Sequence, residues 1–147
     1  MTNIQRSLRG ALLAGPVALL LACGDYATDP RYRTFMGCDV RDIYAGQALG
    51  GTLSSGDCRV QNAYTDMYFL DHRNDQDFLI IDLESFDFDA YLAIYDWDTR
   101  ELLYENDDIN DFDTDARLSG TLPRGRYVIA ASSLAAGETG QYVLTVD

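Results

Sequence analysis

The stretch that decides the fold runs from residue 84 to residue 108 and reads ESFDFDAYLAIYDWDTRELLYENDD. Two runs rich in aromatic and aliphatic residues, 90–95 and 102–105, flank a short polar segment around Asp98 and Thr99. Such runs favour strands, and a polar turn between them is typical of a β-hairpin. Acids and Asn close both ends, where their side chains bond the local backbone and form turns. The sequence therefore predicts a hairpin with its tip near Asp98.

The chain beyond this hairpin continues as short apolar runs separated by turn residues. Regular spacing of this kind predicts an all-β sandwich or barrel. In the last run Tyr142, Leu144 and Val146 share one face, which we expect to be buried. The runs 78–83 and 127–132 are apolar on both faces and are expected to be covered on both sides. The expected strands span residues 47–53, 66–70, 77–83, 90–95, 102–105, 116–121, 126–132 and 141–146.

The charge balance is strongly acidic, with 24 Asp and Glu against 11 cations, all of them Arg. A negative field repels nucleic acid, which we exclude as a partner, and it favours cations or basic protein surfaces. A surface that is acidic only for solubility would give the same composition. With 147 residues the chain has room for one domain.

Residues 1–22 have the layout of a secretory signal: two Arg, then an apolar run that is short for a membrane span. Residues 20–23, LLAC, resemble the bacterial lipoprotein box, which implies that Cys23 becomes the lipidated first residue and anchors the protein to the membrane. An ordinary cleaved signal is the alternative. Gly24 in place of Asp resembles the sorting pattern for the outer membrane. We expect residues 23–43 to be a polar tether and residues 44–147 to be the folded domain.

Two further cysteines, Cys38 and Cys58, lie twenty residues apart. Because exported proteins meet an oxidising compartment, a disulfide between them is the economical expectation. A metal site or a catalytic cysteine would need partners that the sequence does not offer. The single histidine, His72, lies in a polar run and is expected to be a solvated turn residue.

Seven short motifs between residues 44 and 147 together resemble the bacterial pre-peptidase C-terminal domain. The resemblance implies a jelly-roll-like antiparallel β-sandwich of about eight strands, used as an accessory module of exported proteins. Related collagen-binding modules bind calcium and an extended protein ligand. Here the module is expected to follow a lipidated cysteine directly, in place of a peptidase. The motifs are GTL at 51–53, DMYF at 66–69, DFDAYL at 87–92, NDD at 106–108, DARL at 115–118, LPRGRY at 122–127 and GQYVL at 140–144.

Clustered acids are the candidates for calcium, which takes six to eight oxygen ligands in a flexible shell. The most acidic segment supplies five of them, although it is not an EF-hand, because Ala116 and Leu122 stand where that motif needs Gly and Glu. Asp87 and Asp89 point to one side of a strand entrance and are expected to form a structural turn. The five candidate ligands are Asp107, Asp108, Asp111, Asp113 and Asp115.

Aromatic residues near the hairpin tip offer the other candidate site. Trp97, with Tyr95 and Tyr104, could form a platform for a sugar or peptide, and packing within the sheet is the alternative reading. No nucleophile-and-base pattern surrounds His72. We therefore expect a non-catalytic interaction module of the bacterial envelope, with an envelope protein or polysaccharide as partner. The alternatives are a calcium-dependent carbohydrate- or matrix-binding accessory protein and, more distantly, a hydrolase.

Overall fold

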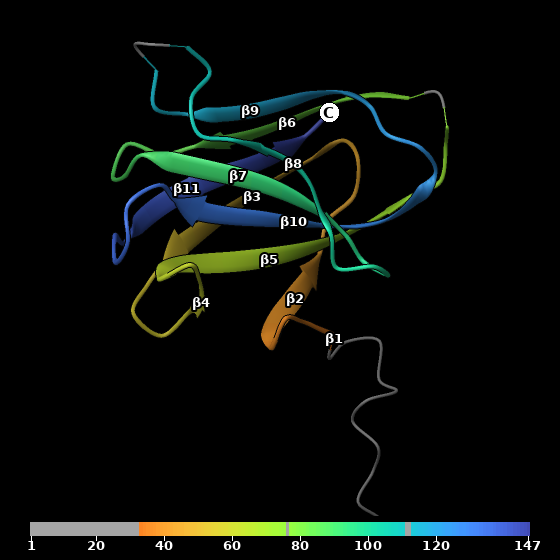
Figure 1. The fold of residues 1–147 in the computed structure, drawn as a ribbon. Helices are drawn as coiled ribbons and strands as arrows, with labels where there is room; N and C mark the ends of the chain where they lie inside the picture. The colour runs from red at the N-terminus through yellow and green to blue at the C-terminus, as the bar shows by residue number, and fades with distance from the viewer. Residues whose placement is uncertain (1–32, 76, 111–112) are drawn as a thin grey trace, which may run out of the picture.

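The structure, a computed structural model, describes residues 33–75, 77–110 and 113–147. These residues form two stacked β-sheets, with the larger sheet nearer the viewer in Figure 1. They contain no helix long and apolar enough to cross a membrane. The strands are β1 (Arg33–Phe35), β2 (Cys38–Asp42), β3 (Gln47–Leu53), β4 (Cys58–Val60), β5 (Ala63–His72), β6 (Phe78–Glu84), β7 (Ala90–Asp96), β8 (Leu102–Asn106), β9 (Ala116–Thr121), β10 (Gly125–Ser133) and β11 (Gly140–Val146).

The larger sheet has seven strands and the smaller has four. The order in the larger sheet is β1-β2-β5-β10-β7-β8, with β4 also paired to β5, and the order in the smaller sheet is β3-β11-β6-β9. Strands β2 and β5 run parallel, and the other pairs run antiparallel. The expected all-β sandwich is confirmed, and the eight expected strands are found as β3 and β5 to β11.

The main core lies between the two sheets and follows the alternation of side chains along each strand. In β11, Tyr142, Leu144 and Val146 are buried, as expected. Burying one such side chain stabilises the fold by about 1.5–3 kcal/mol. Strand β6 was expected to be covered on both faces, but Phe78 is 63% exposed and Ile80 is only half-buried. That expectation was wrong because the smaller sheet has an apolar layer on one face alone.

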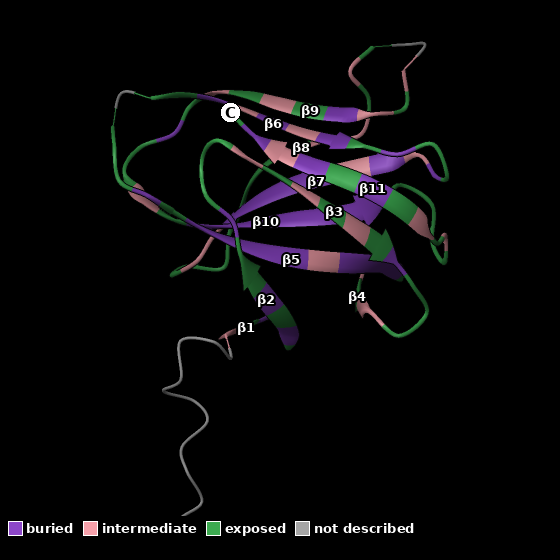
Figure 2. Ribbon diagram, turned by 180° about the vertical axis from the view of Figure 1, so that it is seen from behind, coloured by how far each residue is buried: buried purple, intermediate pink, exposed green. Residues whose placement is uncertain are grey.

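The larger sheet is covered on both faces around β10, which lies between β5 and β7. Figure 2 shows β10 buried along most of its length. Ile129 and Ala131 face the core between the sheets, whereas Val128 and Ala130 belong to a second apolar cluster on the outer face. The expectation for this strand is confirmed. The buried members of the outer cluster are Phe35, Cys38, Val40, Met67, Phe69, Ala93, Tyr95, Val128 and Ala130.

Strands β1 and β2 lie upstream of the expected domain boundary at residue 44. Phe35 and Ile43 are fully buried, and Val40 packs in the outer cluster. The part of the expected tether from residue 33 to residue 43 therefore belongs to the sandwich. These strands are only three and five residues long, and they alternate apolar with polar residues too briefly for a period to be visible.

The hairpin of β7 and β8 is confirmed. Its tip is closed by Asp96, whose carboxylate Oδ1 accepts the backbone N–H groups of Asp98 and Thr99 at 2.8 and 2.7 Å. These hydrogen bonds lower the pKa of Asp96, because they favour the ionised carboxylate. Arg100 takes a positive φ of 67° and turns the chain back toward β8.

Candidate functional site

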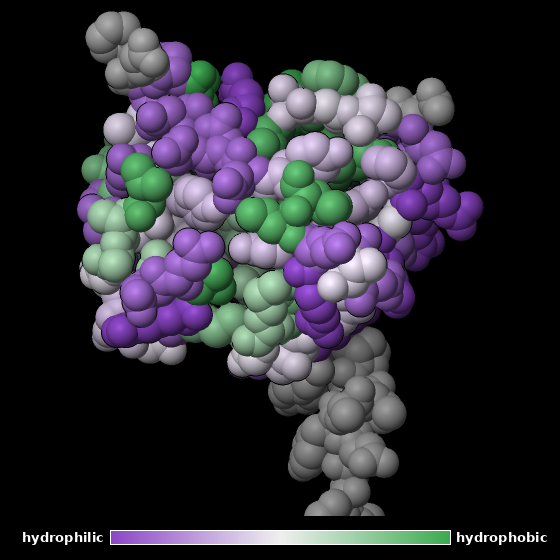
Figure 3. All heavy atoms as spheres, viewed as in Figure 1, coloured by the Kyte–Doolittle hydropathy of each residue, from purple (hydrophilic) through white to green (hydrophobic). Residues whose placement is uncertain are grey.

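The outer face of the larger sheet carries two neighbouring features along β5, β10 and β7. Figure 3 shows this face with white and green residues toward its middle and hydrophilic purple residues on both sides. At one end lies an aromatic cluster, in which Trp97 packs against Phe35 and Phe69 with ring centroids 5.8 and 5.0 Å apart. The guanidinium groups of Arg33 and Arg100 cover two of these rings at 4.1 and 4.5 Å. Arginine therefore caps this end of the face.

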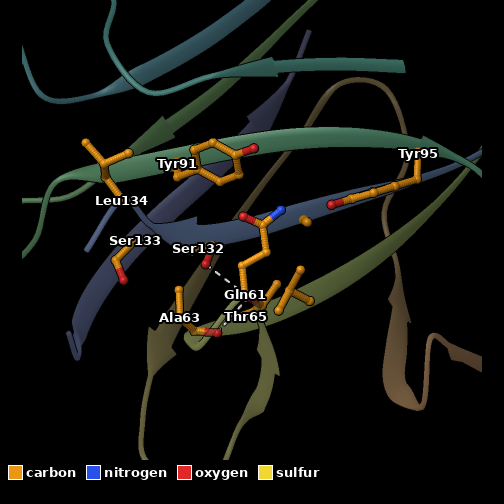
Figure 4. Close-up of a pocket in the computed structure, with 10 residues that line it drawn as sticks. Gln61, Ala63, Thr65, Tyr91, Tyr95, Ser132, Ser133 and Leu134 are labelled. Atoms are coloured by element: carbon orange, nitrogen blue, oxygen red, sulfur yellow. Dashed lines mark hydrogen bonds between the residues drawn. The ribbon is translucent and has the colours of Figure 1, made fainter. Parts of the chain in front are cut away.

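At the other end lies a pocket of about 130 Å³, which we call the hydroxyl pocket. Figure 4 shows its side chains converging from β5, β7, β10 and the β4–β5 turn. Its floor is polar and its sides combine tyrosine rings with aliphatic groups. It is lined by Val60, Gln61, Ala63, Thr65, Tyr91, Tyr95, Ala130, Ser132, Ser133 and Leu134.

Two buried hydroxyl groups form the floor. Thr65 Oγ1 and Ser132 Oγ lie 3.0 Å apart, on neighbouring strands that pair these two residues directly. Ser132 Oγ donates to the backbone carbonyl of Tyr64 at 2.8 Å, and Thr65 Oγ1 lies 3.3 Å from the carbonyl of Ala63. Both hydroxyl protons are thus used within the protein. The oxygens keep lone pairs that face the pocket.

One wall is formed by Tyr91 and Tyr95 of β7. The Tyr91 hydroxyl donates a hydrogen bond to the carboxylate of Glu105 on β8. Burial raises the pKa of both phenols, and the hydrogen bond from Tyr91 to Glu105 raises that of Tyr91 further. The negative charge of Glu105 adds to the shift in both cases. Both phenols therefore stay neutral beside an anionic carboxylate.

The opposite rim is the two-residue turn between β4 and β5. Gln61 and Asn62 have positive φ angles of 51° and 74°, as the turn of a tight hairpin requires. Figure 4 shows the Gln61 side chain lying across the pocket. The expected disulfide is present and joins Cys38 of β2 to Cys58 of β4, with their Cα atoms 5.4 Å apart. The disulfide therefore fixes the strand that carries this rim.

Of the three aromatic residues predicted as a platform, two lie together and one lies apart. Tyr95 is buried and lines the hydroxyl pocket, and both Tyr95 and the half-buried Trp97 pack against Phe35, with ring centroids 5.6 and 5.8 Å from it. Tyr104 is 49% exposed and lines a separate apolar cavity of about 180 Å³ between the sheets, with Ile94 and Leu118. The structure does not bring the three rings together into one surface.

The acidic segment after β8 uses several of its side chains as turn formers. Asn106 Oδ1 accepts the N–H of Asp108 at 2.7 Å, and Asp113 Oδ1 accepts the N–H of Asp115 at 3.2 Å. Asp115 Oδ1 accepts the N–H of Ser85 at 2.8 Å. Asp111 lies outside the described residues. Within the described part of the chain, no three His, Cys, Asp or Glu residues are grouped so as to hold a metal ion.

The two acids at the entrance to β7 have different surroundings. Asp87 Oδ2 accepts the backbone N–H of Gln141 at 2.7 Å and ties the turn to β11. Asp89 Oδ1 is buried and has no hydrogen-bond partner among the described residues. Burial raises the pKa of Asp89, and the charges of Asp108, Asp107 and Glu138 raise it further. A carboxylate of Glu138 also has one buried oxygen, Oε2, without a partner in that part of the chain.

His72 is not the solvated turn residue that we expected. It is the last residue of β5, it is 5% exposed, and its Nε2 has no partner among the described residues. It shares the inward face of β5 with Leu70, because residues two apart point to the same side of a strand. The polar residues around His72 indicated a turn, although β5 continues through His72.

A scan of protein-family models finds no match to the chain, and a search of curated proteins finds none either. Among solved structures, the chain is similar to the pre-peptidase C-terminal domain of a collagenase from Bacillus anthracis, with a TM-score of 0.59 and 16% identity over 75% of this chain and 96% of that one. A periplasmic inhibitor of g-type lysozyme from Aeromonas hydrophila gives a TM-score of 0.48 and 14% identity over 74% and 97%. The first comparison shows that the chain shares the fold of a pre-peptidase C-terminal domain.

Proposed function

We propose that this protein is a non-catalytic binding module of the bacterial cell envelope and that it binds a protein partner through the hydroxyl pocket. The observation that carries the proposal is the composition of that pocket. Tyrosine rings, hydroxyl groups and one amide line it on a rigid sheet face, and none of its described lining residues is Asp, Glu, His or Cys. Flat amphipathic rings give contact area at a small entropy cost, which suits binding. Among the described residues that line the pocket, no His, Asp or Glu stands beside the serines as a base that could make them nucleophiles.

The expected leader supports the proposed location. A secretory signal that ends at Cys23 would deliver the domain across the inner membrane and attach it through acyl chains, preferentially at the outer membrane. The disulfide and the acidic composition suit the same compartment. A pocket on the outer face of a sheet in a tethered module would be open to other envelope proteins.

Site-specific photocrosslinking in the producing cell tests this function. A photoreactive residue replaces Gln61 at the pocket rim or, as the control, Val143, which is 41% exposed on the smaller sheet. We expect position 61 to form discrete adducts with an exported protein and position 143 to form none. A polysaccharide partner would give a polydisperse adduct instead. The same products from both positions, or none from position 61, would contradict the proposal.

A second candidate function is calcium-dependent binding of a carbohydrate or matrix protein. One observation favours it: Asp89 and Glu138 each keep a buried carboxylate oxygen without a partner among the described residues, and Asp107 and Asp108 add negative charge nearby. A hard cation would relieve this repulsion. Calcium should then raise the melting temperature of the wild type more than magnesium does, and it should raise that of Asp89→Asn less. An unchanged melting temperature of the wild type on addition of calcium would contradict this second candidate function.

A further inference from the structure

We propose that the hydroxyl pocket binds the ammonium group and alkyl stem of a lysine side chain from a basic partner protein. This inference rests on the proposed function and specifies the chemistry of the partner. It follows from four features of the pocket: its capacity to accept hydrogen bonds, the charge nearby, its apolar sides and the lack of an Arg among its described lining residues.

The floor can accept hydrogen bonds but has no proton to donate. Ser132 Oγ donates to the Tyr64 carbonyl, and the Thr65 proton goes to Ser132 Oγ or to the Ala63 carbonyl. The Tyr91 hydroxyl donates its proton to a hydrogen bond with the carboxylate of Glu105. These three oxygens therefore offer lone pairs only, and a group that binds to them must bring its own N–H or O–H donors. An ammonium group brings three.

The charge beside the pocket is negative. Glu105 accepts the Tyr91 hydrogen bond, and its field reaches the Tyr95 phenol as well. No Arg is among the described residues that line the pocket. The whole chain carries 24 acids against 11 Arg, so its field draws basic partners and repels anionic polysaccharide and nucleic acid.

The sides of the pocket suit an alkyl stem. Val60, Ala63, Ala130 and Leu134 supply aliphatic surface, and the tyrosine rings present π faces that attract cations. A lysine side chain buries its methylene groups along apolar surface while its charged end meets polar groups. The neighbouring aromatic cluster already holds Arg33 and Arg100 over its rings, whereas the hydroxyl pocket has no such cap among its lining residues.

The test is an NMR titration of the isotope-labelled full-length protein with Nα-acetyl-lysine methylamide at low salt. We expect the amide signals of Thr65, Tyr91 and Ser132 to shift with a Kd of about 1 mM, the affinity that a ligand of this size reaches. The matched probe acetylated on Nε, which is neutral, should leave those signals in place. Added salt should weaken the binding of lysine, because the attraction is electrostatic.

Glu105→Gln should weaken lysine binding by about threefold, as expected for an exposed ion pair. Glu84→Gln, on the smaller sheet, is the matched control and should leave the affinity unchanged. Equal binding of the neutral probe, or no shift at the pocket, would overturn the inference. If the probe fails while photocrosslinking from position 61 still captures a protein, the proposed function stands and the lysine assignment falls. If both fail, the pocket is not a binding site.

Discussion

Gly51 shows how a missing side chain makes room for a buried polar group. A Cβ atom at this position would lie 2.2 Å from Cζ of the Tyr142 ring, which occupies the space instead. The Tyr142 hydroxyl donates to Asp66 and lies 2.6 Å from the Tyr68 hydroxyl, which Arg41 also contacts at 2.7 Å. These hydrogen bonds join the two sheets, because Tyr142 is in β11 of the smaller sheet and Tyr68 is in β5 of the larger one.

Gly51→Ala should therefore lower the free energy of unfolding by about 1–3 kcal/mol, the usual cost of overpacking. The clash falls on a buried ring whose hydroxyl is already engaged, so the ring cannot swing away without breaking hydrogen bonds. Gly50→Ala is the matched control, since a Cβ there meets nothing within 4 Å. Chemical unfolding of both variants measures the difference. Equal stabilities would contradict the role given to Gly51.

Asp89 should destabilise the protein at neutral pH. Its pKa is raised in the folded state, so its contribution to stability is present below the unfolded-state pKa and is lost as the pH rises through the folded-state pKa. We expect Asp89→Asn to melt at a higher temperature than the wild type at pH 7. The gain should vanish below the ordinary carboxyl pKa of about 4, where Asp89 is protonated in both states.

A thermal melt at several pH values measures this difference. Asp39→Asn, at an exposed position of β2, is the control and should change little at any pH. A gain for Asp89→Asn that persists in acid would show that charge is not its cause.

Some pocket residues were visible in the sequence and others were not. Ser132 ends the run 127–132, which is apolar on both faces, and a polar residue in such a strand signals a buried hydrogen bond. Thr65 lies just before the expected strand 66–70, beside Asp66, and gave no such signal. Tyr91 lies in the first strand of the hairpin that the sequence predicted over residues 90–105. Gln61 and Glu105 could not have been assigned to the pocket from the sequence. The position of Gln61 depends on a tight turn, and that of Glu105 depends on which strands become neighbours.

At the scale of elements, the disulfide between β2 and β4 compensates for the shortness of both strands. Strand β4 has three residues and pairs with β5 alone, so hydrogen bonds hold it weakly. Replacing Cys38 and Cys58 together with Ala should reduce the free energy of unfolding by about 3 kcal/mol, the entropy of a loop closed over a sequence separation of 20.

Urea unfolding measures this loss, and hydrogen exchange locates it. The amides of β4 should exchange faster in the double variant, whereas those of β10, at the centre of the sheet, should follow only the global stability. A loss well below 1 kcal/mol, with β4 still protected, would show that packing alone holds the pocket rim.

The longer strands that the sequence predicted correctly carry clear apolar patterns, which are nearly continuous in β7 and β10 and alternate in β11. Those that it missed, β1, β2 and β4, are only three to five residues long, and they join the larger sheet through β2 and β5. Strand β2 pairs in parallel with β5, more than twenty residues further along the chain. Parallel pairing of this kind leaves no turn signal between the partners. The hydroxyl pocket was missed with them, because β4 carries its rim.

At the scale of the whole molecule, the proposed lipid attachment at Cys23 would hold this acidic domain at a membrane. Cys23→Ser should release the protein from the membrane fraction and abolish incorporation of labelled fatty acid, because acyl chains contribute about 0.8 kcal/mol for each buried methylene. The wild type should remain with the membranes after a high-salt wash, which removes proteins held only by charge. A wild-type protein that salt releases would contradict lipid anchoring.

The central claim is that the hydroxyl pocket is where this protein binds its partner, and filling the pocket tests it most directly. Ala130 lines a side of the pocket, and the cavity of about 130 Å³ has room for a larger aliphatic side chain. The measurement is the Kd of the protein captured through position 61, compared between the wild type and Ala130→Leu. We predict an affinity at least about tenfold weaker, which is 1.4 kcal/mol, with the melting temperature nearly unchanged. An equal Kd for a folded Ala130→Leu would contradict the account.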